Sequence, residues 1–202
     1  MSDGVAAEKA RLRERFRAAR AGLAPEARAS AARAVADRVA SLPEWTAARV
    51  VALYWPVLAR GELDVRPLLD AALAAGKRVA LPVVAGASPP ALVFRQAARQ
   101  PDGAVGLVVG RWGLREPPDT APLVEPAAID LVVVPAFGAG REGGRIGHGG
   151  GFYDAFLPTT RAARVGVVYA ACLVDAVPRE PHDVRLDVVV TEADVVRPAA
   201  VR

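Results

Sequence analysis

Residues 50–84 read VVALYWPVLARGELDVRPLLDAALAAGKRVALPVV, and the order of the elements they predict indicates the fold class. It begins with a short apolar run at 50–56 and ends with a second one at 78–84. Between them, residues 64–76 show helical periodicity, and Gly76 is placed to end that helix. A strand, a helix and a second strand in this order form a βαβ unit, whose two strands lie parallel in one sheet.

Two further apolar runs have the same character, DLVVVPAF at 130–137 and RVGVVYA at 164–170. Continuously apolar strands are typical of a sheet that is covered on both faces. We therefore expect an α/β fold in which a mostly parallel sheet is flanked by helices, as a single-domain, three-layer sandwich. Residues 1–202 form this one domain, with its core at 49–192. The proline-rich stretch 85–118 is expected to be irregular, with one strand at 91–95.

The first forty residues predict two helices, so that residues 1–42 form an N-terminal helical pair. In the first helix, apolar residues recur at helical spacing and arginines occupy the remaining positions; the apolar ones are Leu12, Phe16, Ala19 and Leu23, and the arginines are Arg11, Arg13, Arg15, Arg17 and Arg20. The second helix starts at the Ala24-Pro25 turn, carries Val35, Val39 and Leu42 on one face, and ends near Leu42-Pro43.

Composition sets further limits. The chain has 202 residues, 52% of them hydrophobic, and a single cysteine, so it needs no disulfide to fold. No apolar run approaches a membrane span and the N-terminus lacks the apolar segment of a signal peptide, which predicts a cytoplasmic protein. The net charge of +4 fits an anionic ligand, but it equally fits a solvated, arginine-rich surface.

The strongest functional signal follows the strand at 130–137. Eight of the 18 glycines fall between residues 138 and 151, immediately before the aromatic pair Phe152-Tyr153. A strand, a glycine-rich loop and a helix start together present free backbone N–H groups at the carboxyl edge of a sheet, which is typical of a phosphate site. Neither GxxxxGK[ST] nor GxGxxG fits this loop, so a flexible surface loop is the alternative interpretation.

The string RIGHGGGFYDAFL at 145–157, after a strand that ends in Val134-Pro135, resembles the signature of the 5-formyltetrahydrofolate cyclo-ligases, also called methenyltetrahydrofolate synthetases. Four more segments are similar to that family and come in the same order. They are KARLR at 9–13, GELDVRPLL at 61–69, GKRVALPVV at 76–84 and VPREPHDVRLDVVVTE at 177–192. The resemblance therefore covers residues 9–192, nearly the whole chain.

The resemblance implies an enzyme that uses ATP to phosphorylate the formyl oxygen of 5-formyltetrahydrofolate. Attack by N10 and loss of phosphate then leave 5,10-methenyltetrahydrofolate. It implies ATP as co-substrate, Mg²⁺ as cofactor, a reduced folate as substrate, no nucleic-acid or membrane partner, and a monomer or homodimer. Two alternatives are a family member with another substrate or no activity, and a nucleic-acid-binding module that uses the basic N-terminal helix.

For ATP, the resemblance implies two cations four residues apart on one helix face, Lys9 and Arg13. It also implies a nucleotide loop, in which Arg145 and Tyr153 are the catalytic candidates; its residues are Arg145, Ile146, Gly147, His148, Gly149, Gly150, Gly151, Phe152 and Tyr153. Read without the family, Lys9 and Arg13 are solvated charges on an amphipathic helix.

For the folate, Glu62 is the expected acceptor of the pterin N–H donors, because a carboxylate accepts two of them well. Val57 is expected to line the same pocket, and the rear half of the glycine loop, His148, Gly149, Gly150, Gly151 and Phe152, faces the folate. Asp154 and Asp183 are implied to hold Mg²⁺. The alternatives are a loop acid for Glu62, a helix-dipole acid for Asp154 and a turn residue for Asp183.

Four positions depart from the family pattern. Ala139 and Gly140 stand where a Phe-Asp pair is common, Phe152 replaces a frequent Tyr, and Cys172 replaces a usual Gln. We expect Gly140 and Cys172 to matter most, because each removes a polar group near the site. His148 sits at a variable position and has no histidine partner for a metal site.

Overall fold

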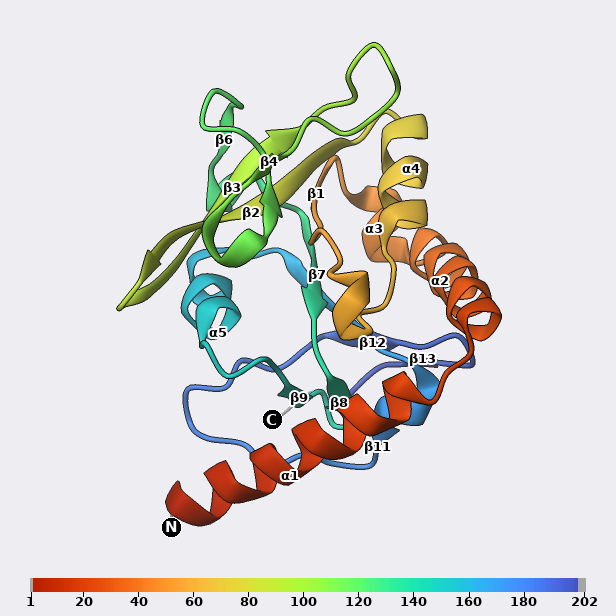
Figure 1. Ribbon diagram of the computed structural model, residues 1–202, viewed down its shortest axis with the longest axis vertical. Helices are drawn as coiled ribbons and strands as arrows, with labels where there is room; N and C mark the ends of the chain where they lie inside the picture. Colours follow the sequence, from red (N-terminus) through yellow and green to blue (C-terminus); the bar gives the residue numbers. More distant parts are fainter. Residues whose placement is uncertain (1, 200–202) are drawn as a thin grey trace.

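The computed structural model describes residues 2–199 and shows one large mixed sheet with helices on both sides (Figure 1). Its strand order is β13-β12-β10-β7-β1-β2-β3-β6. The bounds are β1 Val50–Ala52, β2 Arg78–Ala87, β3 Pro90–Ala97, β6 Leu123–Val124, β7 Leu131–Pro135, β10 Ala163–Val167, β12 Val188–Val190 and β13 Val195–Val196. The strands from β12 to β2 run parallel, and the edge strands are antiparallel.

Helices cover the two faces of this sheet. On one face α2 (Pro25–Ala40) packs against α4 (Arg66–Ala74), with the short α3 (Pro43–Ala47) beside them. On the other face α5 (Phe152–Phe156) packs against β3. The predicted α/β sandwich with a mostly parallel sheet is confirmed, because apolar strands such as β7, with four of its five residues buried, need cover on both sides.

Smaller sheets and helices complete the molecule. One small sheet joins β8 (Gly138–Gly140), β9 (Arg145–Ile146) and β11 (Leu173–Val174), and β4 (Val108–Val109) pairs with β5 (Arg115–Glu116). Single-turn 3-10 helices lie at Leu58–Arg60, Arg111–Gly113, Pro126–Ala128, Leu157–Thr159 and Ala170–Cys172.

The prediction of an irregular stretch at 85–118 was wrong in part. β2 continues to Ala87, and a tight turn connects it to β3. The two strands form a long antiparallel hairpin within the sheet. Prolines suggested loop, but Pro90 opens β3, a position where the missing N–H is tolerated. β4 and β5 then form a second small hairpin that the sequence did not reveal.

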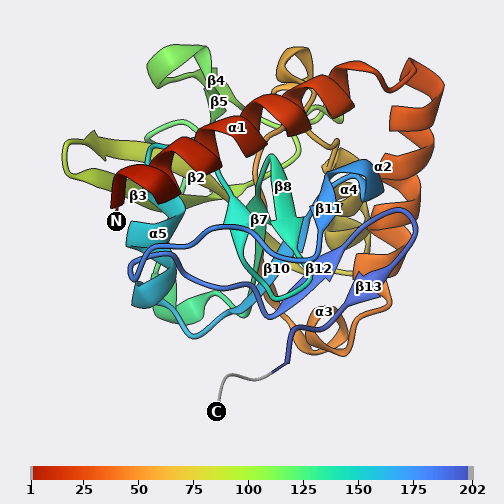
Figure 2. The same ribbon diagram turned by 90° about the horizontal axis from the view of Figure 1, so that it is seen from below.

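The two predicted N-terminal helices are present, yet they pack on different parts of the molecule. α1 (Ser2–Ala21) crosses β8 and β9, while α2 leaves it to pack on α4 (Figure 2). Phe16 is buried as expected, but so is Arg20, one of the arginines outside the predicted apolar face. Arg20 donates to the carbonyl of Ala136 and lies 4.9 Å from the ring of Phe137, so its guanidinium is covered by backbone and aromatic surface.

One hydrophobic core extends from Phe16 on α1 to Val190 on β12. It includes the predicted apolar face of α2, Val35, Val39 and Leu42. In the part of the chain that the structure describes, no helix has the length and apolar character needed to cross a bilayer.

Candidate active site

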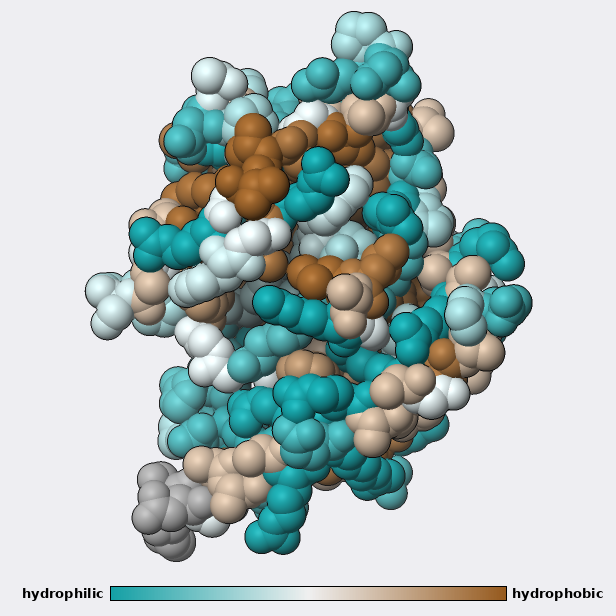
Figure 3. Space-filling view, in the orientation of Figure 1, coloured by the Kyte–Doolittle hydropathy of each residue, from teal (hydrophilic) through white to brown (hydrophobic). Residues whose placement is uncertain are grey.

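A cavity of about 480 Å³ lies where β1 and β7 end. In Figure 3 it opens between the apolar residues that gather over β4 and the hydrophilic side chains that follow α1. Every residue predicted for the site lines it, namely Lys9, Arg13, Val57, Glu62, Arg145 to Asp154 and Asp183. The structure therefore brings together segments from four separate regions of the chain.

The glycine-rich stretch divides into two parts with different structures. Its first part, from Gly138 to Ile146, forms β8, a tight turn and β9, so the prediction that the strand runs directly into an open loop was wrong. The open loop spans residues 147–151, and Gly149 and Gly151 have positive φ values of 92° and 69°. Such angles favour glycine, because a Cβ there is strained.

This loop offers backbone donors to a ligand. Within residues 2–199, the N–H groups of Gly149, Gly150 and Gly151 find no acceptor. α5, which begins after Gly151, has only five residues, so its dipole adds little to the site. Any anion bound here would depend on the amides and on nearby side-chain cations.

Arg145, which precedes the open loop, connects it to α5 and to the C-terminal segment. Its side chain is 5% exposed, and Nη2 donates to Asp154 Oδ1 at 2.6 Å while Nη1 donates to the carbonyl of Val184. Asp154 Oδ1 also accepts from the N–H of Val184 at 3.0 Å. This ion pair joins β9, α5 and the C-terminal segment into one wall of the cavity.

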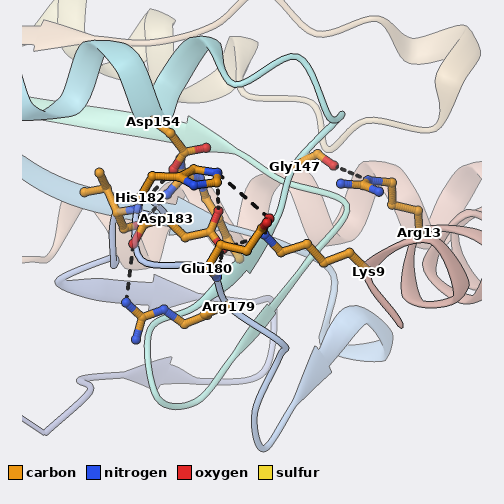
Figure 4. Close-up of polar contacts among 10 residues, drawn as sticks. Lys9, Arg13, Gly147, Asp154, Arg179, Glu180, His182 and Asp183 are labelled. Atoms are coloured by element: carbon orange, nitrogen blue, oxygen red, sulfur yellow. Dashed lines mark hydrogen bonds and ion pairs between the residues drawn. The ribbon is translucent and has the colours of Figure 1, made fainter. Parts of the chain in front are cut away.

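A second cluster joins α1 to the C-terminal segment (Figure 4). The ammonium group of Lys9 donates to Asp183 Oδ2 at 2.6 Å and to Glu180 Oε2 at 2.7 Å. Burial lowers the pKa of Lys9, but the hydrogen bonds to the two carboxylates raise it, and the net direction is upward. For Asp183, burial raises the pKa and Lys9 lowers it, so that the net direction is downward.

Arg13 connects α1 to the glycine loop. Its Nε donates to the carbonyl of Gly147 at 2.8 Å, one helical turn beyond Lys9. The predicted shared helix face of Lys9 and Arg13 is confirmed, and both side chains face the cavity. The face is thus turned inward rather than toward solvent.

The two aspartates predicted to hold Mg²⁺ each keep one oxygen available. In the described residues Asp154 Oδ2 accepts no hydrogen bond, and Asp183 Oδ1 has only His182 Nε2 nearby, at 3.8 Å. Both carboxylates line the same cavity, which is the donor set that a hard divalent cation takes. Asp183 also belongs to a group with Glu180 and His182 whose ligand atoms are all within 4.8 Å of one another. The residues therefore fit such an ion, which Asp183 can bind through Oδ1 while Lys9 stays on Oδ2, or through both oxygens if Lys9 moves away.

At the other end of the cavity, Glu62 is nearly buried. Its Oε2 accepts from the N–H of Val57 at 2.8 Å, and its Oε1 lies 3.1 Å from His148 Nε2. The ring of His148 packs against Phe137, with centroids 4.5 Å apart. A ligand that bonds to Glu62 Oε1 therefore shares this oxygen with His148 or displaces it.

Tyr153 carries a polar group with no partner. Its hydroxyl is buried and makes no hydrogen bond to the described part of the chain. Burial raises the pKa of Tyr153, with the nearby Glu62 acting in the same direction, so the hydroxyl stays protonated. The residue lines the cavity, so a ligand that reaches the buried hydroxyl would meet an unpaired donor.

Sequence reasoning missed several lining residues. Trp112 lies on the turn between β4 and β5, edge-on to Phe152 at 5.8 Å, and Glu116 follows on β5. Glu180 and His182 lie beside Asp183. The only available signal for the last two was their place within the segment 177–192, whereas nothing local marked Trp112 or Glu116.

The departures at Gly140 and Cys172 do not reach the cavity. Neither residue lines it, so the expectation that each removes a polar group from the site was wrong. Cys172 is fully buried behind α1. A Cβ on Gly140 would come within 1.7 Å of Glu142 Oε2, so the Glu142 carboxylate occupies the space that an acid at 140 would need.

The fold and the cavity define an α/β enzyme whose site lies at the carboxyl edge of a parallel sheet. The model of the 5-formyltetrahydrofolate cyclo-ligase family matches residues 5–192. The chain belongs to this family and is an enzyme of the ligase class.

Individual relatives agree with this membership. The 5-formyltetrahydrofolate cyclo-ligase of Escherichia coli K12 is 32% identical over 188 residues, which is 91% of this chain and 98% of the relative. That of Mycolicibacterium smegmatis is 37% identical over 146 residues, 71% of this chain and 73% of the relative. The solved structure of Aquifex aeolicus 5,10-methenyltetrahydrofolate synthetase superimposes with a TM-score of 0.81 at 33% identity, covering 96% and 94% of the two chains. The Mycoplasma pneumoniae synthetase shares the fold, with a TM-score of 0.71 at 21% identity and coverage of 92% and 99%.

Proposed function

We propose that this enzyme converts 5-formyltetrahydrofolate to 5,10-methenyltetrahydrofolate with ATP and Mg²⁺, releasing ADP and phosphate through a phosphorylated formyl intermediate. The observation that carries the proposal is a single cavity with two chemically different ends. One end holds the glycine amides, the cations of Lys9 and Arg13 and the three carboxylates of Asp154, Glu180 and Asp183, and the other holds Glu62 among apolar and aromatic side chains. A nucleotide and a folate need these two environments side by side.

The triphosphate would bind at the polar end. The free amides of the glycine loop donate to phosphate oxygens, and Arg13 adds charge while it holds the loop through Gly147. Lys9 supplies a second cation after it leaves Asp183. Asp154 and Asp183 would hold Mg²⁺, whose bound charge neutralises the phosphates during transfer.

The pterin would bind at the Glu62 end. Glu62 Oε1 accepts a pterin N–H in place of its contact with His148, while Oε2 stays fixed by Val57. Val57 and the ring of Phe152 pack against the folate. The apolar surroundings strengthen the hydrogen bonds of the carboxylate, because little water competes for them.

The reaction proceeds in two steps across the junction of these ends. The formyl oxygen takes the γ-phosphoryl group and ADP leaves. N10 then attacks the formyl carbon, a C–N bond forms, the bond from carbon to the phosphorylated oxygen breaks, and phosphate departs while N10 loses its proton. The Tyr153 hydroxyl donates a hydrogen bond to the reacting oxygens, and Arg145 holds Asp154 in place through their ion pair.

The test is direct. Purified protein is mixed with 5-formyltetrahydrofolate and MgATP, and the absorbance of the methenyl product is followed together with ADP release. Product that requires both ATP and Mg²⁺ supports the proposal. If no product forms at high enzyme concentration, the proposal is wrong, and a family member with another substrate or without activity becomes the better description.

A further inference from the structure

Glu180 lies in the site, but none of the roles above uses it. Its Oε2 receives a hydrogen bond from Lys9 Nζ at 2.7 Å, and its backbone N–H donates to Asp183 Oδ2 at 2.7 Å. Glu180 therefore contacts both the Lys9 ammonium group and the Asp183 carboxylate (Figure 4).

Asp183 Oδ2 is shared between two donors. It accepts from Lys9 Nζ at 2.6 Å and from the Glu180 N–H, while Oδ1 has no donor closer than His182 Nε2, 3.8 Å away. A metal ion that takes both oxygens of Asp183 removes Lys9 from Oδ2, and Lys9 then loses one of its two carboxylate partners. The remaining partner is Glu180.

The position of Lys9 makes this remaining contact important. The Lys9 side chain is 9% exposed, which leaves few directions open to its ammonium group. Besides Glu180 and Asp183, no acceptor within residues 2–199 binds it. Without Glu180, the freed ammonium would have no fixed direction when the nucleotide arrives, and ordering a lysine side chain costs conformational entropy.

We propose that Glu180 is a positioning residue that keeps the Lys9 ammonium group directed at the nucleotide while Asp183 changes its partner from Lys9 to the metal ion. The inference rests on the proposed function, because it takes Lys9 as a phosphate ligand. In this proposal Glu180 acts through Lys9. Its carboxylate also lies in a group with His182 and Asp183 whose ligand atoms are all within 4.8 Å of one another, so the test must separate positioning of Lys9 from metal binding.

The test compares nucleotide binding with and without metal. Glu180→Gln keeps the shape of the side chain and removes its charge, and Glu180→Ala removes the contact altogether. Binding of a non-hydrolysable ATP analogue is measured by calorimetry, first with Mg²⁺ and then with EDTA. With Mg²⁺ we expect both variants to bind the analogue about tenfold more weakly, the loss typical of one charge-assisted hydrogen bond. With EDTA, which removes the metal ion, the loss of affinity should be smaller, because the Asp183 carboxylate still holds the Lys9 ammonium group. The KM for the folate should not change.

Controls separate this role from others. Asp175→Asn changes an exposed acid five residues earlier and should leave nucleotide affinity unchanged. In a Lys9→Met background, Glu180→Gln should have no further effect, since a positioning residue acts only through its partner. Additive losses in the double variant would overturn the proposal.

Two other results would also overturn it. If Glu180→Gln lowers the melting temperature but leaves the affinity for the ATP analogue unchanged, the residue only stabilises the fold. If it weakens Mn²⁺ binding measured by electron paramagnetic resonance without nucleotide, Glu180 is a metal ligand instead. Wild-type protein that binds the analogue but forms no methenyl product would refute the proposed function and leave the role of Glu180 intact.

Discussion

Glu62→Gln tests the folate end of the cavity most sharply. The variant keeps an oxygen for the Val57 N–H but presents an amide group where the wild type has Oε1. A pterin N–H would then face a donor instead of an acceptor. The change should therefore weaken folate binding and leave the nucleotide end unaffected.

The structure sets the size of the expected effect. A charge-assisted hydrogen bond contributes about 1.5–3 kcal/mol. If the folate displaces the half-exposed His148, which lies 3.1 Å from Oε1, loss of that contact offsets up to about 1 kcal/mol. With the full offset the net contribution is about 0.5–2 kcal/mol, which corresponds to a rise of about 2- to 30-fold in the KM for 5-formyltetrahydrofolate.

The assay is the initial rate of methenyl formation, with each substrate varied at saturating levels of the other. The KM for ATP should stay at its wild-type value. Asp64→Asn is the matched control, because Asp64 is two residues away, pairs with Arg66 and does not line the cavity. An unchanged folate KM, or equal changes in both KM values, would refute the assignment of Glu62 to the pterin.

Three further changes test other parts of the site. Arg145→Ala leaves Asp154 partly buried without its cation, so we expect a destabilisation of about 2–4 kcal/mol in urea unfolding and a higher KM for ATP; a fully stable variant would contradict this reasoning. Gly149→Ala places a Cβ at a φ of 92°, which costs about 1–2 kcal/mol, and we expect weaker ATP binding in calorimetry; wild-type affinity would show that the loop conformation is unimportant. Burial raises the pKa of Glu116, so its ionised form is penalised in the folded state. Glu116→Gln should therefore be more stable than wild type well above that raised pKa, and the difference should shrink as pH falls through it, as thermal melts from about pH 8 to about pH 4 can show; a difference that grows toward acid pH would have the wrong sign.

The parallel core was predictable from sequence because its signals are local. Each of the predicted runs at 50–56, 78–84, 130–137 and 164–170 overlaps a strand of the central sheet, and the helix between the first two is α4. Continuous apolar runs and helical periodicity depend only on neighbouring residues. The hairpin of β2 and β3 escaped prediction because its prolines resemble loop signals, and only pairing with the sheet makes those positions strand.

Local motifs also named the residues that line the cavity. The segments around Lys9, Glu62, Arg145 and Asp183 were each identified in sequence, and all four line one cavity in the structure. Their partners were not predictable. Trp112 comes from a hairpin turn in a stretch expected to be irregular, and it reaches Phe152 only through the fold.

The sequence by itself determined the family, the sheet and most of the residues around the site. Tertiary structure alone decided which charges neutralise one another. Helical periodicity places Lys9, Arg13 and Arg20 on α1, but it does not say that Lys9 meets Glu180 and Asp183, or that Arg20 is buried against Phe137. Those contacts join residues more than a hundred positions apart, and they form only because α1 crosses β8 and β9 beside the cavity.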